Sequence, residues 1–292
     1  MGLNGAPECV WPLEAELGEG PVWRNGALWF TDIKKRKIHR FDPAGASRSW
    51  DAPSEPGFIA PLENGHFIAG TKQGLFDFDP ANGAFTRLRT VEPDLPSNRL
   101  NDGAVDAMGR LWFGSMDDGE SRPTGRLYRL DRGALTVMDE GYVITNGPAF
   151  SPDGRTLYHT DTLERRIFAF DVGPDGTLSN KRLFAAIEEG AGWPDGPVTD
   201  AEGCLWTGLF GGWSVRRYAP DGVLLRTVSF PVANVTKIAF GGPGLSTAYA
   251  TTARKGLGPA ALAAQPLAGG LFRFEAGVMG RACPSFASGF TA

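Results

Sequence analysis

Six copies of one short pattern recur along the chain, each with an aromatic residue at its third position. The copies span Ala27–Asp32, Gly65–Gly70, Arg110–Ser115, Thr156–Asp161, Cys204–Leu209 and Thr247–Thr252. Their aromatic residues follow one another at intervals of 38 to 48 residues. This interval is typical of a four-stranded antiparallel unit, so the pattern predicts one small sheet repeated six times.

A second segment of alternating apolar and polar residues follows each copy, as in Lys37–Pro43 and Gly74–Pro80. Turn-forming pairs such as Asn25-Gly26 and Asp153-Gly154 stand where hairpins are needed. Three or four strands repeated six times predict an all-β fold, a six-bladed β-propeller, that takes up residues 1–292 as a single domain. A pair of β-sandwiches is the alternative, but it does not account for six copies in phase.

Two parts of this ring stay open from the sequence. The last blade needs an extra strand, which either the segment near Cys9–Trp11 or the tail near Ala282–Ser288 can supply. We expect no helix of normal length, and we expect residues 256–268, rich in Ala, Gly and Leu, to form a long loop.

Composition and charge exclude several classes of protein. No stretch is long and apolar enough to span a membrane, and a net charge of −4 with mixed signs offers no basic surface to nucleic acid. The N-terminus lacks the pattern of a secretory signal, and Cys9, Cys204 and Cys283 are an odd, sparse set. We therefore expect a cytoplasmic protein, with neither membrane nor nucleic acid as a partner, and we expect a monomer.

Four polar residues stand at equivalent places, where the first strand of a repeat begins. They are Glu19, Asn101, Asn146 and Asp195. First strands line the channel of a propeller, so these side chains should form a ring at one mouth. Buried oxygens facing one another are costly unless a cation lies among them, and such oxygens suit hard divalent ions. The alternative is that they are turn residues at strand starts.

The chain resembles the SMP-30/gluconolactonase family, and the resemblance covers nearly its whole length. It rests on motifs that are specific in combination: Gly18–Trp23, Asn98–Gly103, Asn146–Pro148 with Ser151–Gly154, Pro194–Pro197 and Phe240–Thr247. The resemblance implies a six-bladed propeller, one bound divalent cation and hydrolysis of sugar lactones. It departs from the family pattern at Pro148 and Pro197, which follow the glycines beside two of the implied ligands.

The resemblance also implies roles for individual residues. Glu19, Asn146 and Asp195 become the metal ligands, with Fe²⁺, Zn²⁺, Mn²⁺, Mg²⁺ and Ca²⁺ all open. Arg99 and Asn101 become substrate contacts, which moves Asn101 out of the ligand set. An acidic substrate contact falls within residues 117–120, where Asp118 and Glu120 are the candidates.

The expected reaction is hydrolysis of an aldonolactone, such as D-xylonolactone or D-gluconolactone, to the open-chain acid. Asp195 is then the expected catalytic base, with Asp102 as the second candidate. A metal-dependent esterase acting on other lactones or esters, and a propeller that only binds a partner, are the alternatives. Four aromatic residues, Trp193, Trp213, Phe58 and Phe210, suit either a pocket wall or a binding rim.

Overall fold

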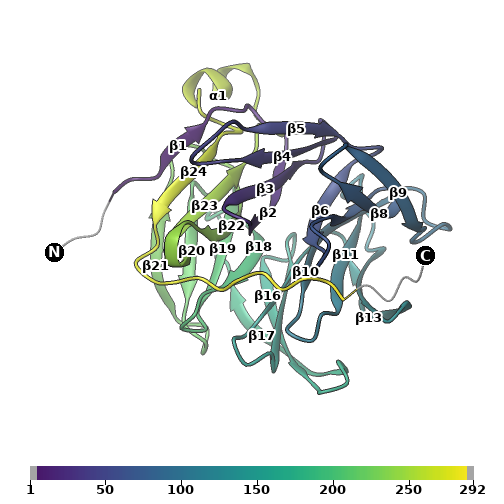
Figure 1. Ribbon diagram of the computed structural model, residues 1–292. Helices are drawn as coiled ribbons and strands as arrows, with labels where there is room; N and C mark the ends of the chain where they lie inside the picture. Colours follow the sequence, from purple (N-terminus) through teal and green to yellow (C-terminus); the bar gives the residue numbers. More distant parts are fainter. Residues whose placement is uncertain (1–4, 288–292) are drawn as a thin grey trace.

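The computed structural model describes residues 5–287, and within them six four-stranded sheets stand around one central channel (Figure 1). Blades 1 to 3 comprise β2 (Gly18–Arg24), β3 (Ala27–Asp32), β4 (Lys37–Phe41) and β5 (Arg48–Asp51); β6 (Pro56–Pro61), β7 (Phe67–Thr71), β8 (Gly74–Asp79) and β9 (Ala84–Arg89); and β10 (Asn98–Val105), β11 (Leu111–Asp117), β12 (Gly125–Asp131) and β13 (Ala134–Tyr142). The expected six-bladed propeller is therefore confirmed.

Blades 4 to 6 follow the same antiparallel order, with one exception at the closing seam. They comprise β14 (Thr145–Phe150), β15 (Thr156–Asp161), β16 (Arg166–Val172) and β17 (Leu178–Ala186); β18 (Trp193–Thr199), β19 (Leu205–Phe210), β20 (Ser214–Tyr218) and β21 (Leu224–Ser229); and β22 (Val235–Gly241), β23 (Thr247–Thr252) and β24 (Leu271–Glu275). The fourth strand of blade 6 is β1 (Glu8–Trp11), which pairs with β24. The N-terminal strand, not the tail, thus completes the last blade.

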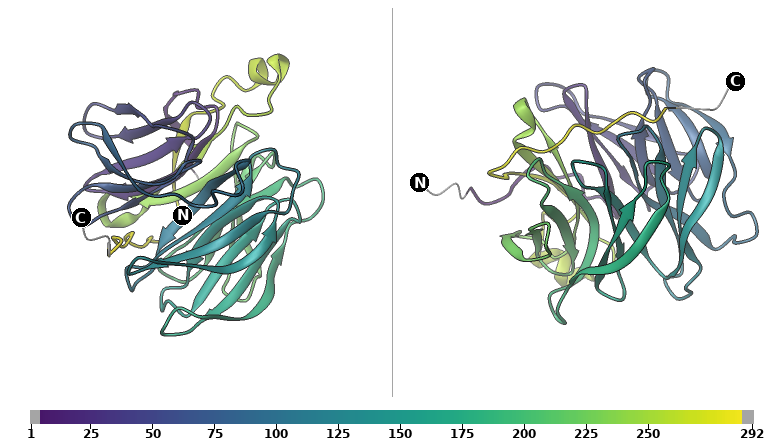
Figure 2. Two further views of the ribbon diagram at one scale, coloured as in Figure 1. Left: turned by 90° about the vertical axis from the view of Figure 1, so that its right-hand side faces the viewer. Right: turned by 90° about the horizontal axis from the view of Figure 1, so that it is seen from below.

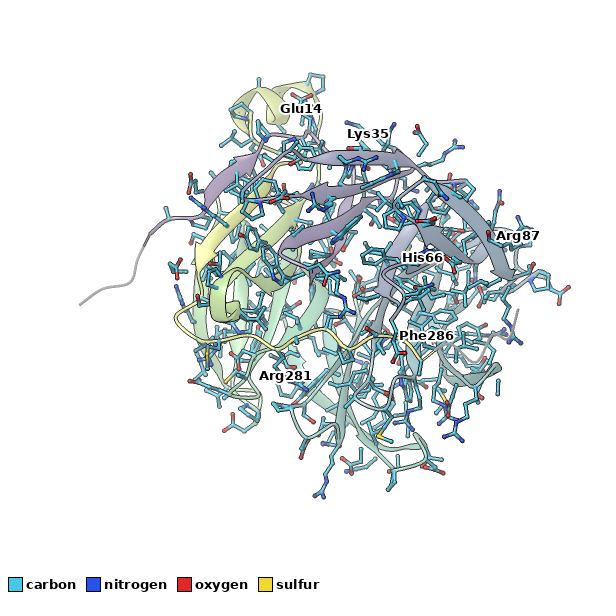
Figure 3. The ribbon with its side chains drawn as sticks, in the orientation of Figure 1. Glu14, Lys35, His66, Arg87, Arg281 and Phe286 are labelled. Carbon is cyan, nitrogen blue, oxygen red and sulfur yellow. The ribbon has the colours of Figure 1, made fainter. Side chains whose placement is uncertain are left out.

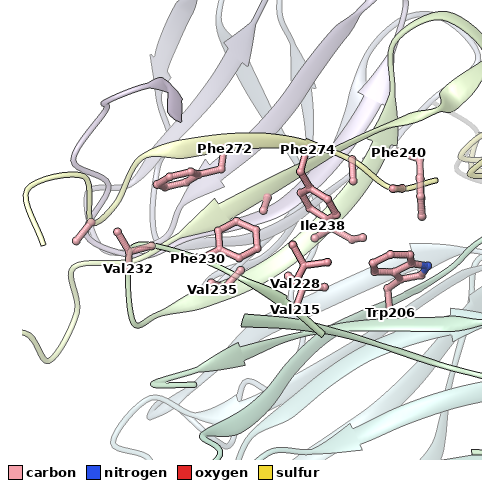
Figure 4. Close-up of a cluster of buried hydrophobic side chains, with 14 residues drawn as sticks. Trp206, Val215, Val228, Phe230, Val232, Val235, Ile238, Phe240, Phe272 and Phe274 are labelled. Atoms are coloured by element: carbon pink, nitrogen blue, oxygen red, sulfur yellow. The ribbon is translucent and has the colours of Figure 1, made fainter. Parts of the chain in front are cut away.

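Aromatic residues of the repeat pack between neighbouring blades. Trp112 and Trp206 are fully buried, and each indole N–H donates to an aspartate six residues earlier, Asp106 and Asp200, at 2.8 Å. The hydrogen bond satisfies the one polar atom of a ring that is otherwise apolar. Figure 4 shows Trp206 in a cluster that joins blades 5 and 6, with Phe230 and neighbouring valines. Burial of each such ring contributes about 1.5–3 kcal/mol.

The innermost strands share one irregularity in register. In blades 1, 3, 4 and 5 the ladder shifts within the three residues that precede the partner of the repeat aromatic. In blade 1 that partner is Val22, which pairs with Trp29. A bulge of this kind bends a strand and redirects its side chains. The four polar residues expected to be equivalent each lie three positions before that paired residue, so their equivalence is confirmed.

The C-terminal strap, residues 276–287, crosses the channel mouth at which the innermost strands end (Figures 1 and 2). Its backbone or side chains bond to loops or strand ends of five blades: Gly280 N–H to Leu245 O, Met279 O to Ala201 N–H, Arg281 to Phe150 O, Phe286 N–H to Pro61 O, and Ala287 N–H to Gly109 O. Figure 3 labels Arg281 and Phe286 along it. A cavity of about 330 Å³ lies beneath the strap.

The segment 256–268 differs from the expected long loop because it contains a short helix, α1 (Pro259–Ala264). Proline at its start supplies a preset φ, and four of its six residues are alanine, which favours helix. A 3₁₀ turn also spans Pro243–Leu245. Within residues 5–287, no helix is long and apolar enough to cross a membrane.

Phe286 anchors the strap, and its removal tests the strap's contribution to stability. The ring is 1% exposed within the cluster of blades 2 and 3, so Phe286→Ala should lower the free energy of unfolding by about 3–5 kcal/mol in urea denaturation. Met279, 61% exposed on the same strap, is the control, and Met279→Ala should change it by no more than about 0.5 kcal/mol. Equal losses in the two variants would contradict a specific anchor.

Candidate active site

A pocket of about 210 Å³ opens at the other mouth of the channel, where the innermost strands begin. Its lining includes the sequence-predicted residues Glu19, Arg99, Asn101, Glu120, Asn146 and Asp195. The structure therefore brings together residues from blades 1, 3, 4 and 5 that are far apart in the sequence. Asp118 stands directly behind this wall, bonded to Arg99.

Glu19 and Asp195 place two carboxyl groups in the buried floor of the pocket. Their side chains are 5% and 6% exposed. Burial, and next the charge of Asp195, raises the pKa of Glu19 well above its ordinary value. Burial, and next the charge of Asp102, raises the pKa of Asp195 to about 7. Two ionised carboxylates held here without a cation therefore repel each other, which is the electrostatic condition that a bound cation relieves.

Hydrogen bonds fix the orientation of two amide side chains beside these carboxyls. Asn146 donates from Nδ2 to Thr162 Oγ1 at 2.9 Å, so its Oδ1 turns to the other side. Asn101 donates to that Oδ1 at 3.1 Å and to Thr145 O at 2.6 Å. Both amide hydrogens of Asn101 thus bond to residues of blade 4.

Arg99 is almost wholly buried and is held by its neighbours. Its Nε donates to Asp118 Oδ1 at 3.0 Å and its Nη1 to Asn101 Oδ1 at 2.5 Å. Lys34 and Lys72 also donate to Asp118, at 2.7 and 3.0 Å. Burial by itself raises the pKa of Asp118, but the hydrogen bonds from these two lysines outweigh it, so the pKa is lowered. Arg99 and Asn101 are expected to point to the same side of the strand, and the hydrogen bond between their side chains agrees with this.

The three acidic residues in segment 117–120 have separate roles in the structure. Asp117 turns away to bond Ser121 and Arg122, which leaves Asp118 behind Arg99 and Glu120 in the pocket lining. Glu120 forms an ion pair with Lys255 at the mouth. Lys255 comes from the loop after β23, so this pair connects blade 3 to blade 6 over the pocket.

The remaining wall of the pocket is apolar. Ile144, Leu163, Trp193 and Phe210 supply it, and Trp193 is 38% exposed with Arg165 stacked 5.0 Å from its ring centre. The expected wall thus includes Trp193 and Phe210. The expectation is wrong for Phe58, which is buried in the core of blades 2 and 3. Trp213 is 45% exposed and is absent from the pocket lining.

Sequence reasoning missed Lys237, whose ammonium lies beneath the pocket. It contacts both oxygens of Asp102, at 2.6 and 2.8 Å. The backbone N–H groups of Gly103 and Gly147 donate to the same carboxylate at 2.8 Å each. With both oxygens occupied in this way, Asp102 is poorly placed to take a proton from water, which leaves Asp195 as the base candidate.

The donor set suits a divalent cation. Glu19, Asn146 and Asp195 offer two carboxylates and one amide oxygen, the chemistry that hard cations prefer. Within residues 5–287, no group of three His, Cys, Asp or Glu side chains is placed to hold a metal ion. The candidate ligand set contains only two residues of these types, Glu19 and Asp195, because its third member is Asn146. His39, His66 and His159 are absent from the pocket lining, so imidazole ligation is not available there.

Comparison with known proteins assigns the family. Residues 17–254 match the model of the "SMP-30/Gluconolactonase/LRE-like region". The chain belongs to this family. The match covers the segments that provide all the pocket residues named above except Lys255.

Several characterised proteins are similar to the chain over nearly its full length. A 6-deoxy-6-sulfogluconolactonase of Pseudomonas putida is 34% identical over 98% of this chain and 100% of its own. An L-arabinolactonase of Azospirillum brasilense is 38% identical over 93% and 92%. Among solved structures, a regucalcin from Agrobacterium tumefaciens described as a calcium-binding protein superposes with a TM-score of 0.93 at 31% identity, over 97% of this chain and 98% of that one.

The raised pKa of Asp195 makes the stability of the metal-free protein depend on pH. The folded protein binds more protons than the unfolded chain between about pH 4, the ordinary value, and about 7, so its free energy of unfolding should fall as the pH rises through this window. Asp195→Asn does not titrate. Thermal melts in chelator should therefore show wild type losing more stability than this variant from pH 5 to 8, and parallel curves would contradict the assignment.

Proposed function

We propose that this protein hydrolyses a sugar-acid lactone to the open-chain aldonic acid with the help of one divalent cation. The observation that carries the proposal is the shared pocket, in which Glu19, Asn146 and Asp195 lie beside Arg99 and Glu120. The first group offers oxygen ligands and the second offers partners for hydroxyl groups. Two relatives whose names state a sugar-acid lactonase activity support it.

Glu19, Asn146 and Asp195 would hold the cation, for which Ca²⁺, Mn²⁺, Zn²⁺ and Fe²⁺ are the candidates. When bound, a cation of this type supplies Lewis-acid stabilisation of the negative charge that develops on the lactone carbonyl oxygen. The protein's own contribution is the fixed position of these three side chains. Thr162 and Asn101 prevent the Asn146 amide from rotating.

Proton transfer is assigned to Asp195. One oxygen of its carboxylate would accept the proton of the attacking water, while the other oxygen would hold the cation. Arg99 and Glu120 orient the ring by hydrogen bonds to its hydroxyl groups. Asp118 keeps Arg99 in place through the bond to Nε, so the guanidinium is preorganised before the substrate arrives.

The preferred substrate within this class is tested by a panel. D-Xylonolactone, D-gluconolactone and L-arabinonolactone differ by one hydroxyl configuration or one hydroxymethyl group, and pH-stat titration of released acid compares them on metal-loaded protein. Hydrolysis of at least one above the uncatalysed rate is the expected result. No hydrolysis of any aldonolactone would favour a propeller that only binds a partner.

The exposed apolar wall favours a second candidate, an esterase for larger lactones or esters. Trp193 and Leu163 are 38% and 40% exposed at the pocket rim, and aliphatic substrates would cover them. An aliphatic lactone in the same panel separates the two. A higher kcat/KM for the aliphatic lactone than for every aldonolactone would make this candidate the better one.

Removal of either carboxyl ligand should remove metal and activity together. Glu19→Ala and Asp195→Ala each delete one oxygen donor of three, so elemental analysis of purified protein should show metal content well below that of wild type, with lactonase activity lost in parallel. A variant that keeps full metal occupancy would show that its residue is not a ligand.

Arg99 should act on the substrate and not on the cation. Arg99→Met should leave metal content normal and lower kcat/KM by an amount corresponding to about 1–3 kcal/mol of lost hydrogen bonding. The loss should be smaller for a lactone without ring hydroxyls. Equal losses on hydroxylated and bare lactones would refute the contact.

A further inference from the structure

Two charged residues stand in the innermost strands of blades 3 and 6 at a position where blades 1, 4 and 5 have glycine. Counted from the residue that pairs with the repeat aromatic, Asp102 and Lys237 occupy the position of Gly20, Gly147 and Gly196. A Cβ at Gly196 would lie 2.5 Å from Cδ of Lys237. Glycine in blade 5 therefore makes the space through which the lysine stem passes.

The two residues form an ion pair across the channel. Asp102 comes from β10 of blade 3 and Lys237 from β22 of blade 6, on opposite sides of the ring, and they are 2% and 6% exposed. The carboxylate also receives the N–H groups of Gly103 and Gly147. A buried pair of this kind persists only where each charge has its partners.

This pair lies directly against the residues proposed to bind the cation. Gly147, whose N–H bonds Asp102, follows Asn146, and Gly196, against which the lysine stem packs, follows Asp195. The charge of Lys237 acts on both Glu19 and Asp195, lowering the pKa of each against the stronger effect of burial. One buried ammonium thus has three carboxylates near it and is bonded to one of them.

We propose that Asp102 is a positioning residue that holds the Lys237 ammonium away from Glu19 and Asp195, so that these two carboxylates remain available to a divalent cation. An ammonium bonded to their oxygens would occupy the ligand positions and compete with the cation. The geometry sets the preference, because Asp102 receives the ammonium on both oxygens while two backbone N–H groups hold the carboxylate still. This inference rests on the proposed cation site.

A second buried ion pair in the same blade serves as a matched control. Asp106 accepts from Arg110 Nε at 2.6 Å, from two backbone N–H groups and from Trp112, and the pair is 4% and 7% exposed. Asp106 directly follows β10 and lies away from the pocket that contains Glu19 and Asp195. Asp106→Asn therefore removes a comparable buried charge without touching the candidate site.

The test measures binding of Mn²⁺ alone by electron paramagnetic resonance, on wild type and on Asp102→Asn, Asp102→Asn with Lys237→Met, and Asp106→Asn. Asp102→Asn should weaken Mn²⁺ binding at least tenfold, because the released ammonium turns to Glu19 and Asp195. Adding Lys237→Met should restore the affinity to within about threefold of wild type. Asp106→Asn should lower the melting temperature and leave the affinity within about twofold.

Two outcomes would overturn the inference: unchanged affinity in Asp102→Asn, or no recovery in the double variant. Should Asp102→Asn fail to fold, Lys237→Met alone decides, since loss of the competing ammonium should leave Mn²⁺ bound as tightly as in wild type or more tightly. A tenfold loss there would mean that the pair acts only as structural support. Absence of Mn²⁺ binding in wild type, together with absence of Ca²⁺, Zn²⁺ and Fe²⁺ binding, would refute the proposed cation site itself.

Discussion

The innermost strand of each blade has one edge with no neighbouring strand, and the design of the channel follows from this. Backbone groups on that edge are buried, and a buried N–H or C=O without a partner is costly. Side chains of adjacent blades therefore complete the hydrogen bonding, as Asp102 does for Gly147 N–H and Asn101 for Thr145 O. The same bonds that close the ring also fix the residues around the candidate site.

Charge in the channel is arranged in layers along its axis. The Glu120–Lys255 pair spans the mouth, the Asp102–Lys237 pair spans the shaft, and between them lie the carboxyls of Glu19 and Asp195. Both pairs join blade 3 to blade 6. Burial is the main cause of the raised pKa values of these two carboxyls, and the negative charge of neighbouring carboxylates adds to it.

Repetition explains what the sequence could predict. The spacing of the aromatic residues defined the blades, and the strand starts defined the ring that contains Glu19, Asn146 and Asp195. The role of Lys237 was not predicted, because its strand does not begin with a polar residue followed by glycine and resembles an ordinary, mostly apolar strand. Blade closure and the short helix after residue 258 depend on pairing between distant segments and on local packing, neither of which a repeat encodes.

The seam in blade 6 bears on how the protein is made. The partner of β1 is β24, more than 250 residues later in the chain, and contacts of such long range form slowly. During synthesis the first strand emerges long before its partner, while the sheets of blades 1 to 5 are each complete within a short stretch of chain. The ring can close only after the final strand leaves the ribosome, and the strap then crosses a mouth that already exists.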